Sequence, residues 1–344
     1  MAYQQIPTRS PNDVITSTDI NQLQENCDCL KNAIGRRNYL INGNFDMWQR
    51  GTSQTTSGYG SDDRWANSNV GSTKTHSQQT CTDTERALFN ATYYSRTVVN
   101  SVSGSGNFVD KMQKIENVTL LAGKTVTLSF WARADGNKPI AVEFRQNFGS
   151  GGSPSSEVSS IGVKKFNLTT NWQRFTHTIT IPSIVGKTLG TDGVHTTFTQ
   201  LFIWFEAGSD WNSHTDNLGQ QSGTFDLAQI KLEDGSQATE GWHPYDGEFG
   251  GEIEACLRYY ETNPFQIFKG YIASGSYYWA YSGFKVMKRT TPTVVLTDIY
   301  NIGFPTGSPT TDYISIYGFG AYKLSNASSS SGVFIYSYTA NAEL

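Results

Sequence analysis

The sequence is poor in charge, in cysteine and in long apolar runs, and each shortage excludes a class of protein. Charged residues make up 16% of the 344 residues, with 26 basic and 30 acidic side chains, so the chain lacks the positive charge that holds nucleic acid. Four scattered cysteines are too few for a disulfide framework. No run approaches the roughly 18 apolar residues of a membrane helix. The N-terminal residues lack a basic stretch leading into an apolar run, so we expect no secretion signal.

Aromatic and turn-forming residues are abundant instead. Aromatics make up 13% of the chain, and there are 33 glycines against 10 prolines. Six runs alternate in the manner of strands, with Gly, Ser, Asn and Asp loops between them. These runs are Thr92–Val99, Lys124–Arg133, Ile140–Phe148, Trp172–Ile181, Gln200–Glu206 and Thr224–Glu233. We expect a mainly β protein in which residues 38–246 form an antiparallel, jelly-roll-type β-sandwich, with Trp131, Trp172 and Trp204 in its core.

The first 37 residues combine a polar, proline-punctuated arm with a helix. N-cap residues occur at 17–19 and Gly35 offers a stop. Apolar residues inside the helix follow steps of three and four, the spacing of a coiled-coil seam. The seam residues are Ile20, Leu23, Cys27, Leu30 and Ile34. Two interpretations are open: self-association through this seam, or docking of the helix on the chain's own domain. Two heptads are marginal alone, so self-association would need help from the larger domains.

Two further segments follow the sandwich. Residues 247–263 are predicted to be a linker helix, because Ile253, Cys256, Leu257 and Tyr260 share one helical face. Residues 264–344 are predicted to form a C-terminal β-rich tip unit that is loaded with tyrosine and carries few charges. About eighty residues of this composition would make a poor lone domain, so we expect association with copies of itself to bury the surplus apolar surface.

The sequence offers little that indicates catalysis. The five histidines are not at metal-ligand spacing, and HExxH, GxSxG, the P-loop and a GxGxxG after a strand are all missing. A glycosidase needs two carboxylates flanking its substrate, and sequence alone does not pair the loop acids in this way. We therefore predict a protein that is not an enzyme and has no catalytic residues. A polysaccharide depolymerase is the weaker alternative.

Sugar binding fits the residue pattern better than catalysis. Sugars stack an apolar face on exposed Trp or Tyr and offer hydroxyls to polar side chains. One aromatic residue, Trp211, lies in a very polar loop at residues 208–223, and the strand at 140–148 places acidic and basic side chains on one face. The predicted glycan-binding residues are Trp211, Asp210, Asn212, Asp216, Glu143 and Arg145. The alternative is an ordinary solvated surface at each of these positions.

A structural calcium ion is the one cofactor that the sequence suggests. Asn44, Asp46 and Asp226 carry the hard oxygen ligands that Ca²⁺ prefers, and they would meet where the first and last strands of the sandwich pair. The alternative is that these three are ordinary polar turn residues. We predict no other cofactor.

Two stretches carry a resemblance to a known family. The first is residues 38–53, NYLINGNFDMWQRGTS, followed by DDRW at 62–65. The second is FDLAQIKLEDG at 225–235, followed by EACLRYY at 254–260. Together they resemble the carbohydrate-binding-module-like sandwich of bacteriophage tail fibre and receptor-binding proteins, over roughly residues 38–261. Several motif residues have the character of core residues: Phe45, Trp48, Trp65, Leu227, Ile230 and Leu232.

The resemblance implies a function and a set of partners. Such fibres are typically homotrimers, which would give the seam at residues 20–34 a purpose. The N-terminal arm would attach to other tail or virion proteins, and the distal β-units would bind host cell-surface glycan during adsorption. The protein would be made in the bacterial cytoplasm and reside in the virion, without nucleic-acid binding or membrane insertion. The alternative within this family is a structural baseplate, neck or head-fibre component.

Overall fold

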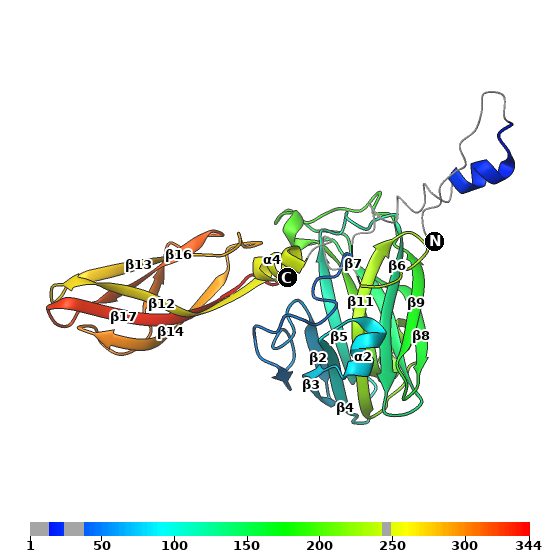
Figure 1. Ribbon diagram of the computed structural model, residues 1–344, viewed down its shortest axis with the longest axis horizontal. Coiled ribbons are helices and arrows are strands. Elements are labelled where there is room, and N and C mark those ends of the chain that lie inside the picture. Colours follow the sequence, from blue (N-terminus) through cyan, green and yellow to red (C-terminus); the bar gives the residue numbers. More distant parts are fainter. Residues whose placement is uncertain (1–13, 24–37, 243–248) are drawn as a thin grey trace.

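The computed structural model describes residues 14–23, 38–242 and 249–344, and in these residues the protein is mainly β. Two bodies of antiparallel strands follow one another along the chain (Figure 1). The larger body is a β-sandwich, and the smaller one, at the C-terminus, extends away from one end of it. Helix α4, Phe249–Tyr259, lies between the two bodies.

The sandwich consists of a six-stranded and a five-stranded sheet, in which all neighbouring strands are antiparallel. The six-stranded sheet has the order β1 (Ser53–Gln54), β3 (Thr73–Thr80), β4 (Tyr93–Asn100), β11 (Gly223–Asp234), β6 (Thr125–Ala134) and β9 (Gln173–Thr180). The five-stranded sheet has the order β2 (Ala66–Val70), β5 (Phe108–Glu116), β10 (Phe198–Ala207), β7 (Lys138–Asn147) and β8 (Val158–Leu168). All six predicted runs are strands. The strands that the pattern missed include β3 and β8, whose many Thr, Ser, Gln and Lys residues blur the apolar alternation.

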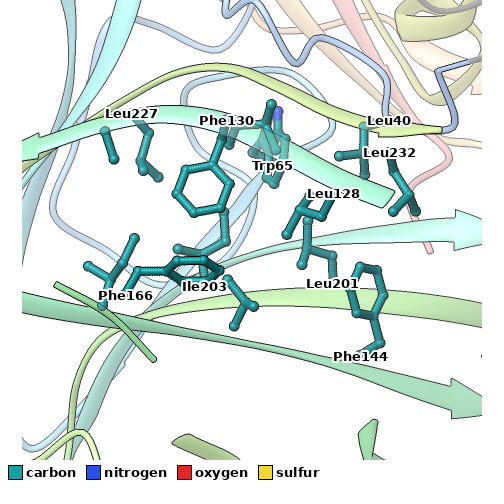
Figure 2. Close-up of a cluster of buried hydrophobic side chains, with 14 of the residues drawn as sticks. Leu40, Trp65, Leu128, Phe130, Phe144, Phe166, Leu201, Ile203, Leu227 and Leu232 are labelled. Carbon is teal, nitrogen blue, oxygen red and sulfur yellow. The ribbon is translucent and has the colours of Figure 1, made fainter. Parts of the chain in front are cut away.

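The core lies between the two sheets, where alternate residues of each strand point inward (Figure 2). Leu128 and Phe130 of the six-stranded sheet face Leu201 and Ile203 of the five-stranded sheet. Each buried side chain of this size contributes about 1.5–3 kcal/mol relative to an exposed one. The prediction for the family motifs is confirmed, since most of these residues are fully buried and Trp48 packs against the core: Phe45, Trp48, Trp65, Leu227, Ile230 and Leu232.

The first aspartate of the DDRW motif, Asp62, forms a buried ion pair in the sandwich. The Asp62 carboxylate pairs with the ammonium group of Lys111 and lies 3.0 Å from Nε2 of His76, and all three side chains are fully buried. Burial works against the charged carboxylate, but His76 and Lys111 outweigh it and hold the pKa of Asp62 well below its usual range. Burial also lowers the pKa of His76 to about 4, so this histidine is neutral near neutral pH.

Helix α2, Asp83–Phe89, covers the outer face of the six-stranded sheet. A reciprocal capping box between Thr82 and Glu85 starts the helix. Its last residue, Phe89, packs against Trp131 and Trp172, with ring centroids 5.9 and 5.0 Å apart. The expectation that both tryptophans lie in the main core is therefore wrong. They belong to a small separate cluster on the outer face, because β6 turns Trp131 away from the core and Trp172 precedes β9.

The C-terminal body packs two three-stranded sheets against each other. Their strand orders are β12 (Tyr260–Ile272), β17 (Ser329–Asn341), β14 (Thr293–Ile302), and β13 (Tyr277–Gly283), β16 (Gly318–Leu324), β15 (Thr310–Asp312). Phe319, Phe334, Tyr336 and Tyr338 lie in a core of their own. Strand β12 begins directly after α4, so the first strand of this body starts inside the segment predicted as linker helix.

The C-terminal residues return to the sandwich and join the two bodies. Glu343 pairs with the buried guanidinium of Arg64 and with Arg50, whose Nη2 lies 3.1 Å from Oε1 of Glu343. The Arg64 guanidinium also stacks 3.5 Å over the ring of Tyr259 in α4. Arg289 donates to the backbone oxygen of His195, in the 3₁₀ helix η1 (Val194–Thr196) of the sandwich. Ion pairs, a cation–π contact and a hydrogen bond thus connect the tip unit to the sandwich.

The N-terminal helix is described over residues 17–23 only. Ile20 and Leu23 of the predicted seam are 58% and 51% exposed. Cys27, Leu30 and Ile34 lie outside the described residues, so the coiled coil stays a prediction. Among the residues that the structure describes, no helix combines the length and apolar character that a membrane span requires.

Candidate functional site

The outer face of the five-stranded sheet gathers aromatic and charged side chains. Alternation along β7 points Glu143 and Arg145 outward, and alternation along β10 does the same for Phe202 and Trp204. Asp110 of β5 stands directly opposite Trp204 on the neighbouring strand. Trp204 was expected in the core. It is almost fully buried, but on this outer face and not between the sheets.

A short helical segment covers part of this face. It consists of the 3₁₀ helix η2, Ser209–Trp211, and the single turn α3, Asn212–Thr215. The ring of Trp211 packs on Phe108 and Trp204, with centroids 5.2 and 5.3 Å away, and its Nε1 donates to the backbone oxygen of Gly106 at 3.1 Å. Trp211 is therefore half-buried and covers Trp204. Only the exposed part of the Trp211 indole is available to stack on a ligand.

Glu143 is the centre of a polar network beneath α3. Its carboxylate is fully buried and accepts from Nε of Arg145 at 2.9 Å and from the backbone nitrogen of Ser160 at 3.0 Å. Nδ1 of His214, on α3, lies 2.9 Å from the same carboxylate. The Arg145 guanidinium stacks 4.2 Å over Phe202. The structure thus brings Glu143, Arg145 and Trp211 together, and it adds His214, a residue of the same polar loop that is not among the six predicted residues.

The other three predicted glycan-binding residues lie on the covering segment. Asp210, Asn212 and Asp216 are exposed. Asp210 accepts from the Ser105 hydroxyl at 3.0 Å, and Asp216 ends α3 in the left-handed conformation, with φ of 51°. We call the six predicted residues, together with His214, Phe202 and Trp204, the α3-side cluster.

Buried polar atoms without partners mark the floor of the α3-side cluster. Asp110 Oδ1, Trp204 Nε1 and Glu206 Oε1 have no hydrogen-bond partner among the described residues. Such atoms are costly to bury unless water or a ligand satisfies them. Burial raises the pKa of Asp110 to about 8, with Arg145 opposing the shift and Glu143 adding to it.

A shallow pocket of about 390 Å³ adjoins the covering segment. Residues 103–105 and 207–209 line it, together with Asn212, Gly219 and Gln220. These side chains offer hydrogen bonds but no aromatic ring. The pocket can therefore supply polar contacts to a ligand, while the stacking surface must come from the α3-side cluster.

Of the three predicted calcium ligands, Asn44 and Asp46 bond to each other, Asn44 Oδ1 has no hydrogen-bond partner among the described residues, and Asp226 is bound by two arginines. Asn44 Nδ2 donates to Asp46 at 2.9 Å. Both carboxylate oxygens of Asp226 accept from arginine, from Arg96 at 2.7 Å and from Arg133 at 2.9 Å. Across the described ranges, no three His, Cys, Asp or Glu side chains form a group that could hold a metal ion. A calcium site at Asn44, Asp46 and Asp226 stays a prediction.

Part of the sandwich matches a known family model. Residues 37–190 match the family model described as a carbohydrate binding domain. No curated protein matches the chain. A solved structure described as CBM4 is 19% identical and covers 56% of this chain and 98% of its own, with a TM-score of 0.33.

Two other solved structures have similar TM-scores and lower sequence identities. The family 11 carbohydrate-binding module from Clostridium thermocellum is 9% identical and covers 55% of this chain and 98% of its own, with a TM-score of 0.32. The enzymatically active domain of tailspike protein 4 from bacteriophage CBA120 is 11% identical and covers 57% of this chain and 21% of its own, with a TM-score of 0.32. The family-model match covers Glu143 and Arg145 but ends before α3.

Proposed function

We propose that the protein is a non-catalytic bacteriophage tail fibre or receptor-binding protein that trimerises and binds host surface glycan during adsorption. The observation that carries the sugar-binding part is the α3-side cluster. There, aromatic rings and hydrogen-bonding side chains share one sheet face of a module that matches a carbohydrate binding domain over residues 37–190. The resemblance of residues 38–53 and 225–235 to phage fibre proteins supports the virion part.

Different members of the cluster would play different roles in binding. The buried Glu143 carboxylate is occupied by Arg145, Ser160 and His214, so it orients these groups without touching a sugar itself. The Arg145 and His214 side chains remain 15% and 20% exposed and can reach sugar hydroxyls. Asn212 and the exposed edge of Trp211 would complete the contact.

Binding of the full chain to a glycan array and to host cells tests this proposal. The variants are Arg145→Gln, His214→Gln and Asn212→Ala, with Lys187→Gln, an exposed cation in the loop after β9, as the matched control. We expect at least one variant to lose about tenfold in affinity, an effect of about 1.4 kcal/mol, with an unchanged melting temperature. A blank array together with absent host-cell binding would contradict the proposal.

The trimer would form through the helix that begins at residue 17. Ile20 and Leu23 are exposed in the single chain, as residues of an unpaired seam would be. Light scattering should give about three times the chain mass. Leu23→Asp should lower that mass by placing like charges in the seam, whereas Asn21→Asp, an exposed residue off the seam, should leave it unchanged. A monomeric parent protein would remove the trimer from the proposal.

A structural role in the virion is the second candidate function. It is favoured by the apolar outer faces of the tip unit, which suit protein contacts better than sugar contacts. In this case the N-terminal arm and the tip unit would both contact other virion proteins. Tight binding of a tail, neck or head protein, combined with blank glycan assays, would favour this candidate over the first.

A further inference from the structure

A second pocket lies on the opposite side of the sandwich from the α3-side cluster. It opens on the outer face of the six-stranded sheet and has a volume of about 160 Å³. Its walls come from α2, from strands β6, β9 and β11, and from residues 240–242. The predicted glycan-binding residues do not line it.

Two tryptophans give this pocket a stacking surface. Trp131 projects from β6 and is half-buried, with its inner side tilted against Phe89. Trp242 is also half-buried and lines the same pocket. The apolar face of a sugar ring packs on such indoles in water, because both surfaces are removed from solvent while the ring hydroxyls stay at the edge.

A buried hydroxyl without a partner lies in the pocket wall. Ser129 of β6 is 1% exposed, and its Oγ finds no hydrogen-bond partner among the described residues. Such a group destabilises the fold as it stands, because it loses its contact with water without gaining another. A ligand hydroxyl in the pocket would supply the missing partner.

Backbone strain at the same place is a second, independent observation. Gln229 adopts φ of 48°, a left-handed conformation that costs energy for a residue other than glycine. It lies in the bulge of β11 between Ala228 and Lys231, and its Nε2 donates to the backbone oxygen of Phe89. The bulge and this bond place the amide in the pocket wall, a recurrent role of bulges beside binding sites.

The remaining wall is held in place and is electrically neutral. Lys231 donates to the backbone oxygens of Thr239 and Gly241, at 3.0 and 2.7 Å. The same ammonium lies 3.4 Å from Glu233, and Arg174 pairs with Glu240 at 2.9 Å. Each cation beside the pocket thus already has an anion, so the pocket offers no unpaired positive charge to an acidic ligand.

We propose that this pocket binds one neutral hexopyranose ring, at a site separate from the α3-side cluster. The volume corresponds to roughly five water molecules in the liquid, so the pocket can enclose most of one ring but not a longer saccharide. Trp131 and Trp242 stack on the ring, while Ser129 and Gln229 bond its hydroxyls. The inference shares its ligand class with the proposed function but does not depend on the α3-side residues.

Titration of the full chain with methyl glycosides of glucose, galactose and mannose tests this site. Binding is followed by tryptophan fluorescence and by saturation-transfer NMR, with sialic acid as the acidic comparison. We expect Ser129→Ala to weaken binding at least fivefold while keeping or raising the melting temperature, since it removes an unpaired hydroxyl. Trp242→Ala should weaken binding by more. The matched control is Ser95→Ala, another buried serine hydroxyl without a partner, which does not line the pocket.

The outcomes separate this inference from the proposed function. A parent protein that binds none of the neutral glycosides overturns the inference, as does a Trp242→Ala variant that loses binding of sialic acid but keeps binding of the neutral glycosides. An unchanged affinity in Ser129→Ala also overturns it, because the hydroxyl would then be merely buried. If Arg145→Gln removes all sugar binding while Ser129→Ala and Trp242→Ala retain it, the α3-side site stands and this second site falls.

Discussion

The sandwich and the tip unit differ in whether helical segments cover the outer faces of their sheets. In the sandwich, α2 covers one outer face with Phe89, and η2 with α3 covers the other with Trp211. Among the residues that the structure describes, none forms such a cover over either outer face of the tip unit. Tyr277, Trp279 and Tyr281 form an exposed stripe along β13, and Ile267 and Tyr300 flank Ile335 in one row across the other sheet.

This difference leads us to propose different partners for the two bodies. A sheet face that the chain covers itself needs nothing further, except where polar atoms or pockets are left for a small ligand. A bare apolar face on a small domain marks a contact with another macromolecule. The sandwich therefore suits small ligands, and the tip unit suits association with copies of itself or with other proteins.

The largest expected loss of stability comes from weakening the packing of α2 on the six-stranded sheet. Phe89→Ala empties the cluster beneath α2, so we expect it to lower the free energy of unfolding of the sandwich by about 3–5 kcal/mol, as for other buried Phe→Ala changes. Denaturant unfolding measures this loss. Leu88→Ala, the exposed neighbour on the same helix, is the control and should cost little. A loss below about 1 kcal/mol for Phe89→Ala would mean that α2 is not an integral cover.

The second largest loss of stability should come from breaking the ion pair between Glu343 and Arg64, which joins the two bodies. Glu343→Gln keeps the side-chain shape but leaves the buried Arg64 without its anion, so we expect the junction to weaken by about 3 kcal/mol. Calorimetry should then show the sandwich and the tip unit melting at more widely separated temperatures. Asp83→Asn, which breaks an exposed pair with Arg86, should leave the melting profile unchanged. A single unaltered transition in Glu343→Gln would contradict this account of the junction.

The free energy of unfolding should also depend on pH, through Asp110 on the covered face of the five-stranded sheet. Burial raises the pKa of Asp110 to about 8, so between about pH 4 and pH 8 the folded chain holds a proton that the unfolded chain has lost. The stability due to Asp110 therefore falls as the pH rises through this window, by up to about 1.4 kcal/mol per pH unit. Asp110→Asn cannot ionise and should gain on the parent from pH 4 to pH 8 in denaturant unfolding. Parallel pH profiles for the two proteins would refute the shift.

The smallest effect on stability should come from the bare faces. Trp279→Ser combined with Tyr281→Ser changes exposed side chains, so we expect the free energy of unfolding to move by less than about 0.5 kcal/mol per substitution. The same pair should reduce self-association or partner binding, measured by sedimentation. Val185→Ser, an isolated exposed apolar residue of the sandwich, should change neither property. Unaltered association in the double variant would mean that the β13 stripe is not a contact surface.

Particular residues show which parts of the fold and of the candidate site could be predicted from the sequence. Glu143 and Arg145 were placed on one strand face correctly, because residues two apart in a strand always share a face. Their contact with His214 could not be predicted, since His214 lies 71 residues from Glu143 along the chain and only the packing of α3 brings the two together. Helix α2 was also missed, although Thr82 and Glu85 carry a visible capping box. The mistake over Trp131 and Trp204 has a related cause, because alternation separates the two faces of a strand without saying which face is covered.

Local alternation and turn chemistry were enough to predict the mainly β character, the six strand runs and the buried motif residues, because these are properties of neighbouring residues. The contacts between distant residues could not be predicted in this way: Asp62 with Lys111, Glu343 with Arg64, and Ser129 with the two pocket tryptophans. These meetings depend on strand order and on how each sheet's outer face is covered. Both are set by burial summed over the whole chain, which no local pattern records.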